Sequence, residues 1–211
     1  MVDFPFFDTE NGVSSLILKE VPYRKTAYIR ILDVQPENLK AHLGECAAFC
    51  RAVGAERIYA AGHPGLADYP FYTSVTEMTG TGQTENPACL FPVTEKTVSR
   101  WREIYNRRMA QVDNAQTLEA RQEAELLAGG AYFVHEAGEL LGIGWLKGNK
   151  LLALASVKPG AGERVLQTMM SLCLGETLHL EVASTNEKAR RLYERLGFCP
   201  GREISRWYRV W

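Results

Sequence analysis

What the sequence lacks excludes several classes of protein. Its 211 residues contain no apolar run close to the ~20 residues that a membrane-spanning helix needs. Lys and Arg number 24 and Asp and Glu number 25, so the formal net charge is only −1. A protein that binds nucleic acid through a broad basic surface needs an excess of positive charge. We therefore expect neither a membrane protein nor a nucleic-acid-binding protein.

Cysteine is scarce, and its distribution argues against a disulfide framework. The five cysteines are an odd number and are scattered along the chain. The first residues have no basic segment of the kind that opens a secretory signal, so we expect a cytoplasmic protein with reduced thiols. Cys46 and Cys50 lie four residues apart on an expected helix, but no second Cys/His pair has metal-site spacing. We predict buried apolar thiols and no metal site.

Turn-forming residues are concentrated in one stretch, which divides the chain. Residues 79–87 read TGTGQTENP and form the best linker candidate. Hydrophobic residues make up 46% of the chain and charged residues 23%, an ordinary globular composition that allows one large or two small domains. We predict an α/β region over 1–86 and a second domain over 87–211.

The most informative stretch is Leu178–Phe198, which reads as a strand followed by an amphipathic helix. Apolar residues alternate with polar ones over 178–182, as in a strand with one buried face. Ser184 and Glu187 form a capping box, which predicts a helix beginning just after Ser184. Gly197 stands where a left-handed residue would end that helix.

One face of this helix carries a small residue between two polar ones. Asn186, Ala189 and Tyr193 occur at positions i, i+3 and i+7. This arrangement indicates a helix with something lying against this face. The alternative is that Asn186 only caps the helix and Tyr193 only packs in the core.

The whole series resembles the closing motif of the GNAT acyl-CoA N-acyltransferase family. That motif runs as a strand, Asn, Ala three residues later, Leu-Tyr and then Gly-Phe, and here Leu192-Tyr193 and Gly197-Phe198 complete it. The resemblance covers the C-terminal ~120 residues and implies the family's mixed-sheet α/β (α+β) fold there. Periodicity independently predicts the family's element order β-α-α-β-β-β-α-β-α-β from Leu90, and agreement between levels supports the assignment. The expected strands are 90–93, 131–136, 140–146, 151–157, 178–182 and 204–210, and the expected helices are the one capped by Thr94, 118–127, 163–173 and the one after Ser184.

Two interpretations of the first 86 residues stay open. Val34-Gln35-Pro36 leads into a helix and the strand 57–61, just as Val157-Lys158-Pro159 leads into a helix and the strand 178–182. The region is either a degenerate partial copy of the same unit or an unrelated β-α-β unit. The first copy lacks glycines after its proline, so we assign no cofactor to it.

Acyl-CoA carries a pyrophosphate, which a glycine-rich turn before a helix can bind through backbone amides. Gly160-Ala161-Gly162 is such a turn, with Glu163 and Arg164 in the first turn of the expected helix. Arg164 or Lys158 would add a positive charge, whereas Glu163 would repel the phosphates. The family's usual Gln or Arg three residues before the first glycine is replaced by Val157, so the loop is about three residues short.

The resemblance also assigns roles in acyl transfer. In the family, a backbone amide on the strand before the phosphate loop holds the thioester oxygen, which here implies the amide of Ser156 or Val157. Tyr193 takes the position of the general acid that meets the leaving thiolate, and Asn186 that of a cofactor-holding amide. The residues expected to bind the cofactor are Ala155, Ser156, Val157, Gly160, Ala161, Gly162, Glu163, Arg164, Asn186, Ala189 and Tyr193.

The general base is not identified by the resemblance. Glu181 lies on the strand beside the expected cleft, and Asp113 and Asn114 lie in the break between the first two helices. A relayed water is an equal alternative. The remaining candidates lie around a hairpin turn and are His135, Glu136 and Glu139.

Other chemistry-bearing residues have simpler interpretations. His63 has no paired Ser, Cys or Asp in a recognisable arrangement, so we expect a surface-loop histidine. Trp207, Tyr208 and Trp211 are expected to be core and edge-strand aromatics, with an exposed patch for self-association as the alternative.

The resemblance therefore implies a cytoplasmic N-acetyltransferase that transfers an acetyl group from acetyl-CoA directly to a small-molecule or peptide amine. The alternatives are a catalytically inactive CoA-binding or partner-binding module, and an enzyme that uses another acyl group. A homodimer is one of the assemblies that the sequence allows. The hypothesis requires the strands 151–157 and 178–182 to part and admit the pantetheine arm.

Overall fold

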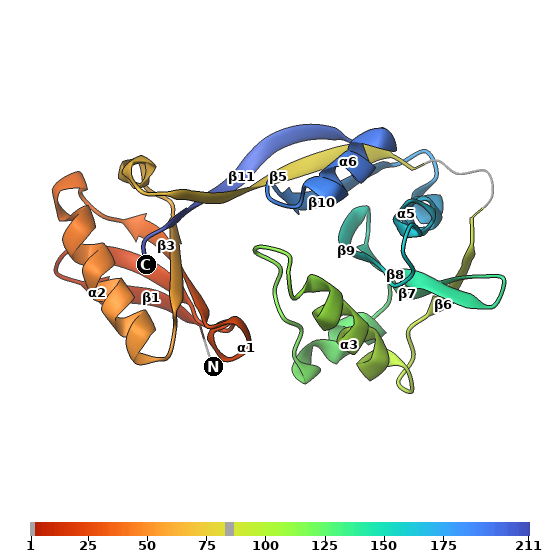
Figure 1. Cartoon of the computed structure of the whole chain (residues 1–211), viewed down its shortest axis with the longest axis horizontal. Coiled ribbons are helices and arrows are strands. Elements are labelled where there is room, and N and C mark those ends of the chain that lie inside the picture. Colours follow the sequence, from red (N-terminus) through yellow and green to blue (C-terminus); the bar gives the residue numbers. More distant parts are fainter. Residues whose placement is uncertain (1–2, 83–86) are drawn as a thin grey trace. The chain divides into compact units, whose positions relative to one another are not determined.

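The computed structural model describes residues 3–82 and 87–211, which form two compact units (Figure 1). The first unit is Met1–Ser74 with Ile204–Trp211, and the second is Val75–Glu203. The division between the units therefore falls after Ser74 and not between 86 and 87 as expected. The reason is that strand β5 (Phe71–Thr81) already pairs with strand β10 (Thr177–Ala183) of the second unit from Val75 to Thr81. Residues 79–81 of the expected linker are therefore strand, and 83–86 lie outside the described residues.

The first unit is a sheet of antiparallel strands with one parallel addition. Its strands β1 to β3 are antiparallel neighbours, β4 joins β3 in parallel, and the end of β11 pairs with β4. Strand β1 and the short helix α1 (Val21–Arg24) were not expected from the sequence. The strand bounds are β1 (Phe4–Thr9), β2 (Gly12–Ile17), β3 (Thr26–Asp33), β4 (Arg57–Ala61) and β11 (Cys199–Arg209).

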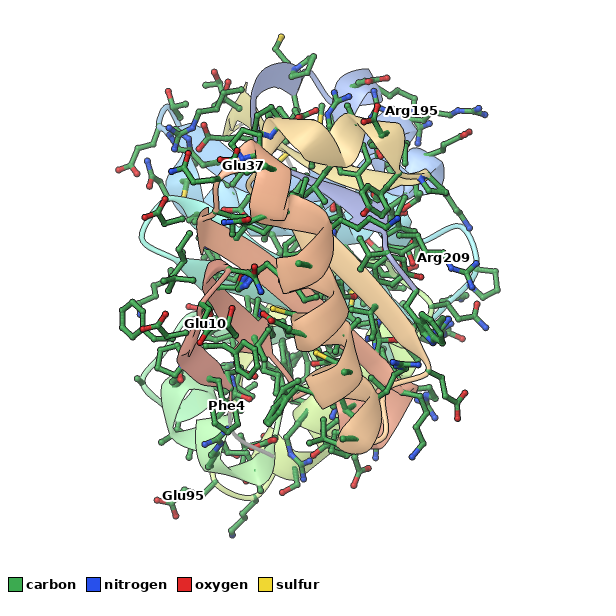
Figure 2. The ribbon with its side chains drawn as sticks, turned by 90° about the vertical axis from the view of Figure 1, so that its left-hand side faces the viewer. Phe4, Glu10, Glu37, Glu95, Arg195 and Arg209 are labelled. Atoms are coloured by element: carbon green, nitrogen blue, oxygen red, sulfur yellow. The ribbon has the colours of Figure 1, made fainter. Side chains whose placement is uncertain are left out.

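Helix α2 (Leu39–Ala52) covers one face of this sheet (Figure 2). It follows a short 3₁₀ turn (Pro36–Asn38), in which Pro36 supplies the fixed φ that suits a helix start. Cys46 and Cys50 point into the core and are fully buried free thiols, as predicted. Burial raises the pKa of Cys46 to about 11 and that of Cys50 to about 12, so both are inert.

The C-terminal aromatics divide between the core and the surface. Trp207 is buried beside Tyr28, with ring centroids 5.2 Å apart, as expected for a core residue. Tyr208 packs against the core that α2 covers. Trp211 is 52% exposed, and the guanidinium of Arg51 lies 4.1 Å above its ring.

The second unit is a mixed sheet in the order β5-β10-β9-β8-β7-β6. Its pairs are antiparallel except for β9 and β10, which run parallel. The predicted order of elements from Leu90 onward is confirmed, with small shifts at the ends. The strands are β6 (Cys89–Pro92), β7 (Ala131–Glu136), β8 (Glu139–Lys147), β9 (Lys150–Ser156) and β10 (Thr177–Ala183).

Helices cover both faces of this sheet. Helices α3 (Val98–Met109) and α4 (Glu123–Leu127) pack on one face, and α5 (Gly162–Met170) and α6 (Glu187–Arg195) on the other. Gly142 and Gly144 on β8 allow α5 to approach closely, because a Cβ on Gly142 would lie 2.8 Å from a methyl of Val165. Within the described residues, no helix combines the length and apolarity needed to cross a membrane.

Both units contain the same succession of paired strands and a crossover helix. In β1-β2-β3-α2-β4 and in β7-β8-β9-α5-β10, the first three strands are antiparallel neighbours and the fourth joins the third in parallel. Val34-Gln35-Pro36 follows β3, and Val157-Lys158-Pro159 follows β9. The two sequence triplets thus occupy the same place in the same topology.

Candidate active site

Strands β9 and β10 lie side by side at only one end. His179 is paired with Lys150 and Leu180 with Leu151, and the remaining residues of these two fully described strands are not paired with each other. Strand β10 stays paired with β5 as far as Ala183, while β9 stays paired with β8 as far as Ser156. The two strands therefore part after Leu180, as the sequence-based hypothesis requires.

A β-bulge gives the physical reason for this parting. Trp145 of β8 is opposite Ala153, but Leu146 is opposite Leu151, so Leu152 has no partner on β8. A bulge bends the strand that carries the extra residue and increases its twist. This one follows directly after the last β9–β10 pair, so it turns the rest of β9 away from β10.

Beyond the bulge, alternate amides of β9 are directed at the opening. The amide of Val157 donates to the carbonyl of Leu141 at 2.8 Å and is therefore committed to the β8 side, which corrects the prediction for Val157. Neighbouring amides of an antiparallel strand face opposite sides, so those of Ser156 and Leu154 face the opening. Ser156 was predicted, whereas Leu154 was missed because a backbone donor leaves no signal in residue type.

A cavity of about 700 Å³ lies between the end of β9, the following loop and α6. It brings together eight of the eleven residues predicted to bind the cofactor. The described lining leaves out Val157, Ala161 and Arg164. The eight that line it are Ala155, Ser156, Gly160, Gly162, Glu163, Asn186, Ala189 and Tyr193.

The short loop between β9 and α5 forms one end of this cavity. Helix α5 begins at Gly162, and the first amides of a helix have no partner within it. Gly160 has a φ of +80°, which favours glycine, and open space surrounds the position of a Cβ. An anion at this helix end would meet free amides and the positive end of the helix dipole.

The two cations predicted to charge this loop, Arg164 and Lys158, form ion pairs outside the cavity. The side chain of Arg164 donates to Glu136, with 2.7 Å between Nε and Oε1, and Lys158 pairs with Glu139. Both acceptors lie at the hairpin between β7 and β8. Neither cation lines the cavity, which corrects the expectation that Arg164 or Lys158 charges the phosphate loop.

Four other cations are among the described residues of the lining instead. Arg108 comes from α3, and Lys188, Arg191 and Arg195 come from one face of α6. The spacing i, i+3, i+7 of the three α6 residues is a sequence signal that could have revealed them. Arg195 Nη2 lies 3.0 Å from Glu163 Oε2, so the acidic group expected to repel phosphate is paired with a cation.

Helix α6 starts two residues later than expected and ends as expected. Its N-cap is Asn186, whose Oδ1 accepts from the amide of Ala189 at 3.3 Å, so the predicted Ser184–Glu187 capping box is wrong. At the other end Gly197 has a φ of +85° and the Phe198 amide donates to the carbonyl of Tyr193 at 3.0 Å. This closure is a Schellman motif, with the predicted glycine in the left-handed position.

Tyr193 lies where two cavities meet. The residue is 8% exposed, and burial raises the pKa of its phenol to about 12. The phenol therefore keeps its proton at all ordinary pH values and can act only as a neutral hydrogen-bond donor or acceptor. Asn186 and Ala189 line both cavities with it, so the three residues of the predicted helix face share one surface.

The second cavity has a volume of about 450 Å³ and lies on the other side of the parted strands. The loop after α3 and the facing parts of β9 and β10 form its walls. Asn114 in this loop has a φ of +59°, and its buried Nδ2 has no hydrogen-bond partner in the described part of the chain. Residues common to both cavities are Met109, Val112, Leu154, Asn186, Ala189 and Tyr193.

The structure separates the candidates for a general base into two groups. Glu181, Asp113 and Asn114 line the second cavity, and Glu181 forms an ion pair with Lys150. The other three lie at the β7–β8 hairpin, and neither cavity includes them among its described lining residues. His135 packs against Phe91, while Glu136 and Glu139 hold the cations described above.

Two histidines of the first unit have structural roles. His63 accepts a hydrogen bond from the amide of Gly65 at 3.0 Å and so caps a 3₁₀ turn, consistent with a loop histidine. His42 Nε2 lies 2.7 Å from Ser14 Oγ, but both residues have no exposed surface. Burial lowers the pKa of His42, so this pair is a neutral polar contact within the core rather than an accessible nucleophile.

Comparison with known proteins identifies the fold. No family model matches the sequence, and no curated protein matches it. Solved structures do match at low sequence identity; several are described as GNAT-family acetyltransferases and others as proteins of unknown function. The chain therefore has the GNAT acetyltransferase fold, as the resemblance implied.

Three of these structures indicate the extent of the likeness. A GCN5-related N-acetyltransferase from Sphaerobacter thermophilus has a TM-score of 0.55 at 10% identity, covering 93% of this chain and 75% of the other. A GNAT-family acetyltransferase from Colwellia psychrerythraea has a TM-score of 0.51 at 10% identity, covering 97% and 83%. A tandem GNAT protein from the clavulanic acid biosynthesis pathway has a TM-score of 0.50 at 18% identity, covering 94% and 78%.

Proposed function

We propose that the chain is an N-acetyltransferase that transfers the acetyl group of acetyl-CoA directly to an amine. The observation that carries this proposal is the parting of β9 and β10, with one cavity on each side and Tyr193 at the junction. Two cavities that meet at one buried donor suit a reaction between two bound substrates. The GNAT fold of the chain supports the same assignment.

The 700 Å³ cavity suits the CoA moiety. Phosphate groups would lie against the α5 N-terminus and among Arg108, Lys188 and Arg191, which supply the positive charge that the short loop lacks. Asn186 presents a polar side chain and Ala189 a small one along the path toward Tyr193. These residues fit an anionic cofactor with an extended arm.

The transfer step needs a donor at the oxygen and a donor at the sulfur. The amine nitrogen forms a bond to the thioester carbonyl carbon, the carbon–sulfur bond breaks, nitrogen loses a proton and sulfur gains one. The amides of Leu154 and Ser156 face the opening and would stabilise the negative charge that develops on the carbonyl oxygen. The hydroxyl of Tyr193 would donate to the departing sulfur.

The incoming amine loses its proton more easily when it binds in an apolar environment. Burial lowers the pKa of an ammonium, so a site lined by Leu154, Leu180 and Val182 favours the neutral nucleophile. Asp113 lines the same cavity and would take the proton directly or through water.

We also propose that the first unit is a degenerate partial copy without a cofactor groove. It has the same succession of strands and helix as the second unit, but β3 and β4 are paired over five consecutive positions, from Thr26–Arg57 to Arg30–Ala61. No gap of the β9–β10 kind exists between these two described strands. The likeness to a tandem GNAT protein along 94% of the chain supports this proposal.

Ligand-dependent melting and turnover test the proposed function. Acetyl-CoA at ~100 times its Kd should stabilise the protein by about 2.7 kcal/mol, and CoA should be released when amines are added. If neither CoA nor acetyl-CoA raises the melting temperature, the proposal fails. Stabilisation without acetylation of any amine would instead support the alternative of an inactive CoA-binding module.

A further inference from the structure

We propose that the amine acceptor carries a second positive charge, as a small diamine or polyamine does; this inference rests on the proposed function. The lining of the 450 Å³ cavity contains three carboxylates, those of Asp113, Glu125 and Glu181. Among the described residues of this lining there is no lysine or arginine. The described lining of the adjoining 700 Å³ cavity has Arg108, Lys188, Arg191 and Arg195 against Glu163 and Glu187, so positive charge prevails there and negative charge prevails in the 450 Å³ cavity.

The acidic residues and the buried residues occupy different parts of the wall. Glu125 and Glu181 are exposed, so they lie where the cavity opens to solvent. Met109, Val112, Leu154 and Ala189 line both cavities together with the buried Tyr193, so the end that meets the first cavity is mostly apolar. The acceptor cavity thus has an apolar inner end and an acidic mouth.

This gradient distinguishes the reacting amine from a second cation. An amine beside several carboxylates stays protonated, because nearby negative charge raises its pKa, and a protonated amine cannot attack. The apolar inner end favours the neutral form instead. The carboxylates at the mouth therefore suit a second ammonium group that remains charged while the first one reacts.

The wall between these two ends suits an alkyl segment. Trp145 and Tyr105 are buried aromatic residues of the lining, and Leu118 is a buried aliphatic one. Apolar side chains of this kind bury methylene groups favourably. A diamine has such a segment between its two charges, and its shape matches the order of the wall.

Among the carboxylates, Glu125 offers the cleanest test. Glu181 is joined to Lys150 by an ion pair with 2.5 Å between Nζ and Oε1, so changing it would also free a lysine. Glu125 is exposed on α4, and a single exposed ion pair changes affinity by about two- to fivefold. Glu103 on α3 is also exposed but lines neither cavity, so Glu103→Gln is the matched control.

The first experiment measures acetylation by the full chain at saturating acetyl-CoA. It compares three acceptors that share a four-carbon chain: putrescine, butylamine and aminobutanol. We expect kcat/KM for putrescine to exceed that for the other two by about tenfold at low ionic strength, and the preference to shrink at high salt. Equal values for putrescine and butylamine would overturn the inference.

The second experiment uses the variants. Glu125→Gln should raise KM for putrescine by about two- to fivefold with little change in kcat, and leave KM for butylamine unchanged. Glu103→Gln should leave both unchanged. If Glu125→Gln affects the two amines equally, the carboxylate does not bind a second cation and the inference fails.

Failure of the proposed function is distinguishable from failure of this inference. If no amine is acetylated, the enzyme assignment fails, and calorimetric titration of the CoA-saturated protein with putrescine and butylamine still measures which amine the cavity binds. Tighter binding of putrescine, weakened by Glu125→Gln, would support a dication site. Equal or absent binding of the two amines would contradict it.

Discussion

Tyr193 is buried, lies where the two cavities meet and stays protonated at ordinary pH. Its pKa of about 12 lies above that of a free thiol, about 8.5, so complete proton transfer to a thiolate is uphill. Its contribution to the proposed reaction is therefore a hydrogen bond that strengthens as charge develops on sulfur. Such a donor acts without a change in its own charge, because the raised pKa keeps the phenol neutral until strongly alkaline pH.

Replacing Tyr193 by Phe tests this role at the level of one atom. Turnover should fall by ~10²-fold or more, while the Kd for acetyl-CoA changes little, because the ring and its packing against Phe198 remain. Steady-state kinetics and calorimetry measure the two effects separately. Undiminished turnover in Tyr193→Phe would exclude this hydroxyl from the reaction.

The carboxylate of Glu163 is the residue-scale feature that opposes phosphate binding. It lies in the cavity lining and accepts two hydrogen bonds from Arg195, at 3.0 Å from Nη2 and at 3.3 Å from Nε. Both groups are well exposed, so their mutual interaction is screened by solvent and is weak.

Removal of this carboxylate should therefore tighten cofactor binding. Glu163→Gln releases Arg195 and deletes one negative charge, so the Kd for acetyl-CoA should fall by about two- to fivefold, with the gain lost at high salt. Isothermal titration at two ionic strengths measures this. Weaker binding by the variant would mean that Glu163 itself contacts the cofactor or that its first-turn charge on α5 matters more.

At the scale of elements, the site depends on how β9 is held. The bulge at Leu152 turns the strand from β10, and α5 presses against β8 at glycines that leave no room for a Cβ. A Cβ on Gly142 would come 2.4 Å from the carbonyl oxygen of Ala155 and 3.1 Å from Cα of Ser156. Packing around Gly142 thus fixes the part of β9 that supplies the amides of the opening.

Gly142→Ala should consequently damage both stability and the site. Backbone atoms must move to admit the methyl group, which we expect to cost about 1–3 kcal/mol and to weaken acetyl-CoA binding. Gly44 in α2 has open space around its Cβ position, so Gly44→Ala should stabilise the protein by about 0.5–1 kcal/mol instead. Chemical denaturation of both variants measures the contrast, and equal effects would contradict the packing argument.

At the scale of the whole molecule, two units share one topology but differ in one pairing. In the first unit β3 and β4 are joined over five positions, whereas in the second the corresponding strands β9 and β10 are joined over two. The same succession of elements thus yields a closed sheet in one unit and an opening in the other.

Hydrogen exchange can show which unit responds to the ligand. Acetyl-CoA should slow exchange in residues 150–163 and in α6, where the proposed site lies, and leave β3, β4 and α2 unchanged. The first unit serves as an internal control in the same sample, measured by mass spectrometry of peptides. Comparable protection of 26–33 and 57–61 would contradict the proposal that the first unit has no cofactor groove.

Local signals in the sequence determined most elements and one face of the site. The alternation over 178–182, the left-handed Gly197 and the spacing of Asn186, Ala189 and Tyr193 are short-range features, and the structure has the strand, the helix end and the common surface that they predict. The helix start was misplaced because Ser184 and Asn186 both suit an N-cap, and the sequence motif does not rank them.

Only the tertiary structure decided which charges and backbone groups meet at the opening. Arg108 reaches the cavity from α3, while Arg164 and Lys158 pair with carboxylates of a hairpin. These contacts join residues that are distant in sequence, so no local pattern predicts them. The bulge at Leu152 and the free amide of Leu154 depend on the register between neighbouring strands rather than on side-chain type. The sequence by itself determined the helix face that lines the two cavities, and long-range packing decided what surrounds it.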